Sequence, residues 1–176
     1  MKRIIETKRL YLRELIKSDK EELSKILTDP ESMKFYPTTF NDKKVEDWIK
    51  WNIDNYKKYR HGLWAVILKE GNIFLGDCGI TIQDIEGEPL PELGYHIKKE
   101  YCNKGFATEA AIACMEYAFK IFDYPVVYTY TKYDNKPSLR VAEKNGMKFV
   151  RYFDKEVMGE NVREVLYCKH RVTSIF

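Results

Sequence analysis

The pattern of hydrophobic and polar positions divides the chain into short strand-like segments and longer helix-like ones. Strict alternation marks the first strand, where Leu10 and Leu12 alternate with Tyr11 and Arg13. A continuous apolar run, such as 63–68, is typical of a strand that is buried on both faces. On these criteria the sequence predicts strands at 4–15, 63–68, 73–83, 92–97, 126–132, 148–158 and 162–172.

Apolar residues that recur at helical spacing predict helices between these strands. The clearest helix covers 105–122, where one face carries Ala107, Ala111, Cys114, Met115, Ala118 and Phe122. An earlier helix is expected to begin at Ser18, with Glu21 completing a capping box, and to end before Pro30. The other two helices cover 42–59 and 136–144, and the second has Asn135 as its cap.

The order of these elements predicts the architecture. In the middle of the chain a strand, a long helix and another strand follow one another, and this connection requires a crossover between parallel neighbours. Turn signals at 70–72 and 159–161 join two further pairs of strands as hairpins, so we expect the outer strands to be antiparallel. We therefore expect a mixed α/β fold in a single domain, 1–176, with a central sheet of about seven strands and helices on both faces.

The composition is that of a globular protein, and it limits the classes of function. The 176 residues are 44% hydrophobic and 32% charged, and the formal net charge is only +3. This small charge, with short basic clusters at 57–61 and 169–171, argues against dedicated nucleic-acid binding. No segment resembles a secretion signal or a membrane span, so we expect a cytoplasmic protein with no membrane partner.

The four cysteines do not form a metal-binding or disulfide pattern. Cys78, Cys102, Cys114 and Cys168 lack C-x-x-C spacing and have no histidine pair nearby. We therefore expect small buried side chains rather than disulfides, and no metal site.

The segment from Tyr95 to Ala110 is the best candidate for a functional site. A short strand leads into a polar turn, and Gly105 then opens the long helix. The first amides of a helix are unpaired and lie at the positive end of its dipole, and small residues let a phosphate approach them. With Lys98, Lys99 and Lys104 nearby, this predicts an anion site for a group such as pyrophosphate. The alternative is an ordinary helix start with solvated lysines.

Three motifs in order resemble those of the GCN5-related N-acetyltransferase (GNAT) superfamily. The segment from Cys102 to Ala107 is similar to its pyrophosphate loop, with Gly105 at the glycine and Cys102 in place of glutamine or arginine. The segment 135–147 resembles a second family motif that begins with asparagine and ends after a glycine. The segment 7–13 resembles the first strand of the branch that acetylates N-terminal alanine or serine of ribosomal proteins.

This resemblance implies acetyl-CoA as cosubstrate. In such enzymes the pantetheine arm lies in an acyl-CoA cleft where two parallel strands splay apart, and the matching strands here are 92–97 and 126–132. The residues that would hold acetyl-CoA are Tyr95, His96, Ile97, Cys102, Asn103, Lys104, Gly105, Phe106, Ala107, Thr108, Asn135 and Ser138.

The chemistry that the resemblance implies is direct attack of a primary amine on the acetyl carbonyl. Glu92 is the candidate base, and the alternative is a solvated carboxylate at the end of a strand. Ser138 is the candidate proton donor to the leaving thiolate, unless it only bonds the backbone of its own helix. His96 is a further candidate base, although a lone histidine on a strand is more often packed or solvated. Glu164 and Tyr167 are expected to border the acceptor.

The identity of the acceptor amine stays open. It could be the N-terminal amine of a protein, including a ribosomal protein, or a small-molecule amine such as a polyamine, an amino acid or an antibiotic. The two N-terminal helices and the loop at 37–40 are expected to shape its groove. A fold without turnover would instead be an acyl-CoA-binding module. A homodimer is compatible with the sequence.

Overall fold

The computed structural model describes residues 2–172 and contains all the predicted strands, with two main differences in their extent. The strand predicted at 92–97 begins earlier, at Glu88, and pairs with the preceding strand along its whole length. The predicted strand 4–15 is divided into β1 (Ile5–Glu6) and β2 (Leu10–Glu14). Thr7 turns the chain between them, and its hydroxyl oxygen accepts a hydrogen bond from the amide of Leu10 at 2.9 Å. The sheet therefore has eight strands rather than about seven.

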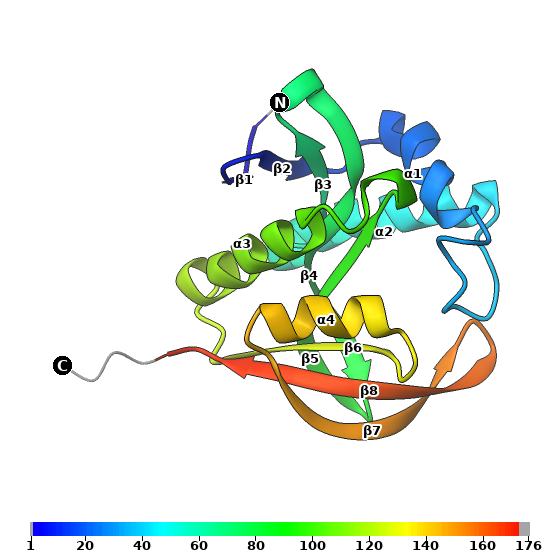
Figure 1. Ribbon diagram of the computed structural model, residues 1–176, viewed down its shortest axis with the longest axis vertical. Coiled ribbons are helices and arrows are strands. Elements are labelled where there is room, and N and C mark those ends of the chain that lie inside the picture. Colours follow the sequence, from blue (N-terminus) through cyan, green and yellow to red (C-terminus); the bar gives the residue numbers. More distant parts are fainter. Residues whose placement is uncertain (1, 173–176) are drawn as a thin grey trace.

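The parallel pair predicted from the crossover is present in this sheet (Figure 1). The strand order is β1-β2-β3-β4-β5-β6-β8-β7, and every neighbouring pair is antiparallel except β5 and β6. The remaining strands are β3 (Leu63–Leu68), β4 (Ile73–Ile85), β5 (Glu88–Ile97), β6 (Val126–Lys132), β7 (Lys148–Val157) and β8 (Glu160–His170).

Helices cover both faces of the sheet, as predicted. They are α1 (Lys20–Leu27), α2 (Asp42–Tyr59), α3 (Phe106–Ile121) and α4 (Lys136–Lys144), with short 3-10 helices at Lys17–Asp19, Glu70–Asn72 and Lys99–Tyr101. In Figure 1, α3 and α4 lie on the near side of the sheet and α2 lies behind it. The buried side chains of α3 pack with Trp64 and Leu93, whereas those of α1 and α2 pack with Ala65 and Ile67.

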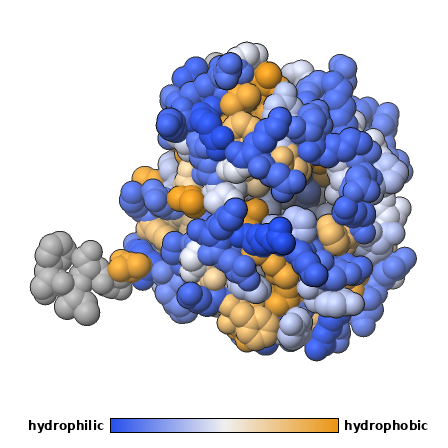
Figure 2. All heavy atoms as spheres, viewed as in Figure 1, coloured by the Kyte–Doolittle hydropathy of each residue, from blue (hydrophilic) through white to orange (hydrophobic). Residues whose placement is uncertain are grey.

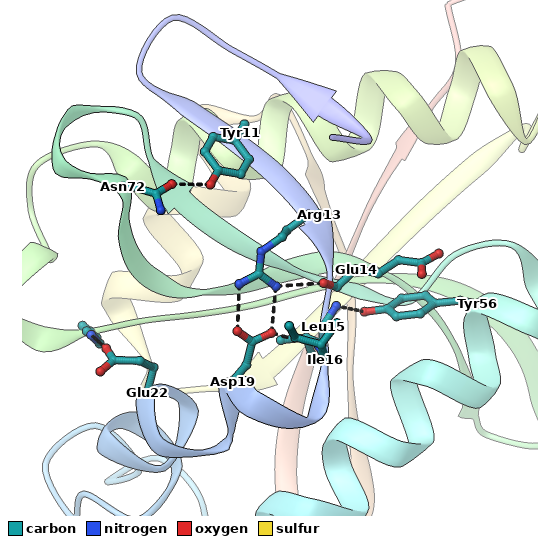
Figure 3. Close-up of polar contacts among 10 residues, drawn as sticks. Tyr11, Arg13, Glu14, Leu15, Ile16, Asp19, Glu22, Tyr56 and Asn72 are labelled. Carbon is teal, nitrogen blue, oxygen red and sulfur yellow. Dashed lines mark hydrogen bonds and ion pairs between the residues drawn. The ribbon is translucent and has the colours of Figure 1, made fainter. Parts of the chain in front are cut away.

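The start of α1 differs from the predicted capping box. Asp19, rather than Ser18, is the residue before the helix, and its side chain does not cap it. The carboxylate of Asp19 instead accepts two hydrogen bonds from Arg13, at 2.7 and 2.8 Å, and one from the amide of Ile16 at 2.9 Å (Figure 3). An arginine on β2 therefore fixes the position at which the first helix leaves the sheet.

Removing this ion pair is expected to destabilise the fold. In Asp19→Ala the guanidinium of Arg13, whose side chain is only 12% exposed, loses its counter-charge. Breaking a buried pair in this way costs about 3 kcal/mol, which corresponds to a fall in Tm of about 6–12 °C for a chain of this length. Thermal unfolding measures this loss. The exposed pair of Arg3 and Glu6 is the control, and Glu6→Ala is expected to leave Tm nearly unchanged. An equally small effect of Asp19→Ala would contradict the assignment.

The surface is largely hydrophilic, with apolar patches that include the lower edge of the view over β7 and β8 (Figure 2). The exposed apolar side chains on β7 are Phe149, Val150 and Tyr152. Cys78 and Cys114 are buried, as predicted, whereas Cys102 is exposed; all four cysteines are free. Within residues 2–172 no helix combines the length and apolar character required to cross a bilayer.

Candidate active site

β5 and β6 separate soon after they begin to pair. In the described part of the chain their register consists of one pair, Glu92 with Tyr128. Beyond that pair β5 continues along β4, and β6 continues along β8. The splayed parallel pair is thus confirmed, and it leaves a break in the backbone ladder that an extended, amide-containing ligand can fill by strand addition.

The loop after β5 presents backbone amides at the start of α3. Asn103 and Gly105 both have a left-handed backbone, with φ of 61° and 80°. Gly105 is the N-cap, so the amides of the next three residues, Phe106, Ala107 and Thr108, open the first turn and have no acceptor within the helix. A hollow of about 550 Å³ lies beside this turn and is lined by Gly105 and Thr108, among others. The free amides are the groups that an anion site requires, whereas the hollow itself is also lined by three carboxylates, Glu6, Glu109 and Glu116.

Two of the three lysines that were expected to add positive charge at this loop are paired with carboxylates. Lys98 is buried and its ammonium is bonded to Glu22, which removes it from the anion site. Lys99 pairs with Asp29 at 3.4 Å. The ammonium of Lys104 lies 5.1 Å from the centre of the Tyr101 ring.

Arg9 supports the loop from the N-terminal strands, a role that was not predicted. Its Nε donates to Glu109 at 2.6 Å, and its Nη1 donates to the carbonyl oxygen of Lys104 at 3.0 Å. The guanidinium also lies 4.3 Å from the centre of the Phe106 ring. Arg9 and Glu109 are 100 residues apart in sequence, so no local pattern could have linked them.

Two of the predicted cofactor residues direct their side chains away from the loop surface. The Sγ of Cys102 points back to the carbonyl oxygens of Ile97 and Lys98, at 3.7 and 3.6 Å. The ring of Phe106 is buried in the core. Any contact of Phe106 with a bound anion would therefore involve its backbone, whereas Cys102 stays exposed.

The cross-strand register places the predicted base on the sheet face opposite α3. Residues that are paired across strands, or two apart along a strand, share a face. The pairs Asp77–His96, Thr81–Glu92, Glu92–Tyr128 and Lys132–Glu164 then define one polar face. Its members are Asp77, Thr81, Glu92, His96, Tyr128, Tyr130, Lys132 and Glu164.

Glu92 is buried at the point where the parallel strands separate. Only 8% of the residue is exposed, and its Oε2 accepts a hydrogen bond from the hydroxyl of Thr81 at 3.4 Å. This oxygen lies 3.3 Å from the place where a Cβ on Gly94 would stand, so the missing side chain makes room for the carboxyl group. Burial raises the pKa of Glu92 to about 8. A solvated strand-end carboxylate, the alternative reading of the sequence, is therefore wrong.

His96 belongs to a hydrogen-bonded chain on the same face. Its Nδ1 lies 2.8 Å from Asp77, and its Nε2 lies 2.9 Å from the hydroxyl of Tyr36. The fully buried Asp77 also accepts from Trp48 Nε1 at 3.0 Å. Burial lowers the pKa of His96, but the charge and hydrogen bond of Asp77 outweigh this effect and the pKa is raised. Asp77 and Tyr36 were not predicted, because nothing in their sequence surroundings marks them.

Ser138 lies on the other side of the sheet, at the start of α4. Asn135 caps this helix, as predicted, and its side chain accepts from the amide of Ser138 at 3.3 Å. The hydroxyl of Tyr95 lies 2.9 Å from both the carbonyl oxygen and the Oγ of Ser138. Where β5 and β6 separate, the hydroxyl groups of Tyr95 and Ser138 thus lie on the side of α4, and the buried carboxyl groups of Glu92 and Asp77 lie on the opposite side of the sheet. Tyr95 was predicted as a cofactor residue, but its contact with Ser138 was not.

The basic cluster at 57–61 is smaller on the surface than its sequence suggests. His61 is completely buried, and its two ring nitrogens lie 2.7 Å from the carbonyl oxygen of Ile80 and 2.8 Å from the hydroxyl of Tyr124. It therefore contributes nothing to a nucleic-acid surface.

Comparison with known proteins identifies the family. The family model of the acetyltransferase (GNAT) domain matches residues 9–148. The uncharacterised protein YkkB of Bacillus subtilis (strain 168) is 35% identical over 144 residues, which cover 81% of this chain and 84% of YkkB. The uncharacterised N-acetyltransferase YnaD of the same strain is 32% identical over 153 residues, 86% of each chain.

Solved structures have the same fold. A GNAT-family acetyltransferase from Bacillus anthracis matches with a TM-score of 0.79 at 29% identity, over 94% of this chain and 97% of that one. The ribosomal L7/L12 α-N-protein acetyltransferase RimL in complex with coenzyme A has a TM-score of 0.79 at 15% identity, over 96% and 98%. Together with the domain match, these relatives show that the chain belongs to the acetyltransferase (GNAT) family and is an acetyl-transferring enzyme.

Proposed function

We propose that the enzyme transfers an acetyl group from acetyl-CoA to a primary amine by direct attack in a ternary complex. The observation that supports this proposal most strongly is the position of Glu92. It is a buried carboxyl group with a pKa of about 8, and it lies where β5 and β6 separate. The hydroxyl groups of Ser138 and Tyr95 lie on the opposite side of the sheet.

The residues around the splay fit acetyl-CoA. The left-handed Gly105 and the free amides of the first turn of α3 are suited to a pyrophosphate. The backbone of 95–97 is suited to the amides of a pantetheine arm, because the ladder between β5 and β6 is interrupted there. Segment 102–108 would hold the pyrophosphate, and Asn135 and Ser138 would border the arm.

Acetyl-CoA supplies the thioester carbonyl that the amine attacks. Glu92 takes the proton of the attacking amine, and its pKa of about 8 is close to the value of about 7.7–8.0 for an α-amine. Such matching makes proton transfer nearly balanced in free energy. Backbone N–H groups of 95–97 polarise the carbonyl, and the hydroxyl of Ser138 donates a proton to the thiolate.

The acceptor is a primary amine of one of two kinds. The likeness to RimL, named an α-N-protein acetyltransferase, favours the N-terminal amine of a protein. The buried carboxyl groups Glu92 and Glu164 favour a small cationic amine. The cytoplasmic location and a homodimer stay predictions.

Thermal unfolding with added ligands tests the cosubstrate. A ligand at 100 times its Kd stabilises the folded state by about 2.7 kcal/mol, so acetyl-CoA and CoA are expected to raise Tm by about 5–10 °C. ATP and NAD serve as controls and are expected to have no effect. No shift with acetyl-CoA, or an equal shift with the controls, would refute the cosubstrate. A shift without release of the CoA thiol in the presence of any tested amine would instead indicate an acyl-CoA-binding module.

A further inference from the structure

We propose that Glu164 forms a second cation site for the acceptor, and that the enzyme prefers small amines that carry another ammonium group, such as linear diamines. The proposal rests on the proposed function, because it assigns the substrate class of the same site. Its starting point is a buried carboxylate oxygen that has no hydrogen-bond partner within residues 2–172.

Glu164 lies on β8 and is only 5% exposed. Its Oε2 is buried and has no hydrogen-bond partner among the described residues. Carboxylate oxygens are costly to bury without a donor, and nearly all buried polar groups in proteins have one. An unsatisfied acceptor of this kind indicates that a donor comes from outside the chain.

The surroundings of Glu164 belong to the face that carries Glu92. Lys132 of β6 pairs with Glu164 in register, and Tyr130 lies two residues away on the same face of β6. Burial raises the pKa of Tyr130, and the charges of Glu92 and Glu164 raise the pKa values of both Tyr130 and the more exposed Tyr36. Both phenols therefore lie within the electrostatic reach of the two carboxyl groups. Aromatic side chains beside carboxylates are a common environment for ammonium ions.

The other charged groups on this face are already engaged. Asp77 is bonded to His96 and Trp48, at 2.8 and 3.0 Å. Lys132 pairs with Asp134 at 3.3 Å, and the ammonium of Lys155 donates to a backbone carbonyl oxygen. The positive charges of Lys132 and Lys155 favour the ionised form of Glu164, although neither ammonium group is hydrogen-bonded to its carboxylate.

Glu92 and Glu164 are assigned different roles because they lie at different positions on the sheet face. Glu92 lies at the separation of the strands and is the group that meets the reacting amine. Burial raises the pKa of Glu164 to about 7, although Lys155 and Lys132 act in the opposite direction. Near neutral pH this carboxyl group is therefore poised to ionise when a cation approaches. A second ammonium group on the acceptor supplies both the missing donor and the missing charge.

The test compares a linear diamine with the monoamine of the same carbon chain, for chains of four to six carbons, at saturating acetyl-CoA. Wild-type enzyme is expected to favour the best diamine in kcat/KM by about 10- to 100-fold, because a charged hydrogen bond is gained. In Glu164→Gln this ratio is expected to fall close to one. Glu156→Gln is the matched control, since Glu156 is exposed on the neighbouring strand β7. It is expected to keep the wild-type ratio.

The outcomes separate this proposal from the proposed function. Equal use of diamine and monoamine by the wild type, or an unchanged preference in Glu164→Gln, would overturn the cation site while acetyl transfer stands. If no amine is acetylated, calorimetric titration of the CoA-bound protein with the diamine decides the matter. Diamine binding that is lost in Glu164→Gln would support the site although transfer has failed, and no binding to the wild type would overturn it.

Discussion

Replacing Glu92 with glutamine is expected to lower kcat/KM for the acceptor amine by about 100- to 10,000-fold, the usual contribution of a general base. Glutamine is close to glutamate in size and can keep the hydrogen bond from Thr81, but it cannot take a proton. Thiol release from acetyl-CoA measures the rate. The control is Glu88→Gln, because Glu88 is exposed on the same strand. A rate that is unchanged in Glu92→Gln would show that another group is the base.

The pH dependence of the same pair of proteins gives a second readout. A base must be ionised to act, so wild-type kcat/KM is expected to rise as the pH rises through about 8, the pKa of Glu92. The folded pKa lies above the value of about 4.3 in an unfolded chain, so the stability that this group contributes is complete below pH 4 and declines as the pH rises toward 8. The glutamine variant is therefore expected to be slower and also more stable at pH 8, with a Tm higher by about 4 °C or more.

Replacing Gly105 with leucine is expected to weaken acetyl-CoA binding by at least about 100-fold, which corresponds to about 2.7 kcal/mol. The new side chain would stand beside the first amides of α3, and it would also strain a backbone with φ of 80°. That strain costs about 1–2 kcal/mol, so the variant is expected to fold with a modestly lower Tm. Calorimetric titration measures the change in Kd.

Gly159 provides the matched control for this strain. It lies in the turn between β7 and β8 with φ of 85°, and an added Cβ there would have no neighbour within 4 Å. Gly159→Leu is expected to lower Tm by a similar amount and to leave acetyl-CoA binding intact. If Gly105→Leu also binds acetyl-CoA with the wild-type Kd, the pyrophosphate does not lie at this helix.

Most of the fold could be predicted because it depends on local patterns. The periodicity of α3 and the cap of α4 at Asn135 depend only on residues that are close in sequence. The errors arose where side chains compete for the same backbone. Thr7 turns the chain inside a run that reads as one strand. The carboxylate of Asp19 accepts hydrogen bonds from Arg13, and the first helix begins after Asp19 rather than after Ser18.

The candidate site was predictable only in part. The resemblance to the family indicated Glu92, Ser138 and the loop at Gly105, but these roles stay predictions. The environment of each group could not be predicted, because burial is a property of the assembled sheet. From the sequence alone, Glu92 would be given the ordinary pKa of a solvated glutamate, whereas burial in the folded protein raises that pKa to about 8. The contact of His96 with Tyr36 joins residues that are 60 positions apart, which no spacing rule detects.

The single registered pair between β5 and β6 has a consequence for folding. It divides the sheet into two antiparallel halves, β1 to β5 and β6 to β7, each of which includes hairpins between successive strands. Contacts that are local in sequence form early, whereas the seam between the halves depends on a distant crossover and one pair of residues. We therefore expect this seam to close late in folding and to exchange its amide hydrogens early. Because the proposed acetyl-CoA cleft lies at this seam, we expect bound acetyl-CoA to stabilise the native sheet against local opening there.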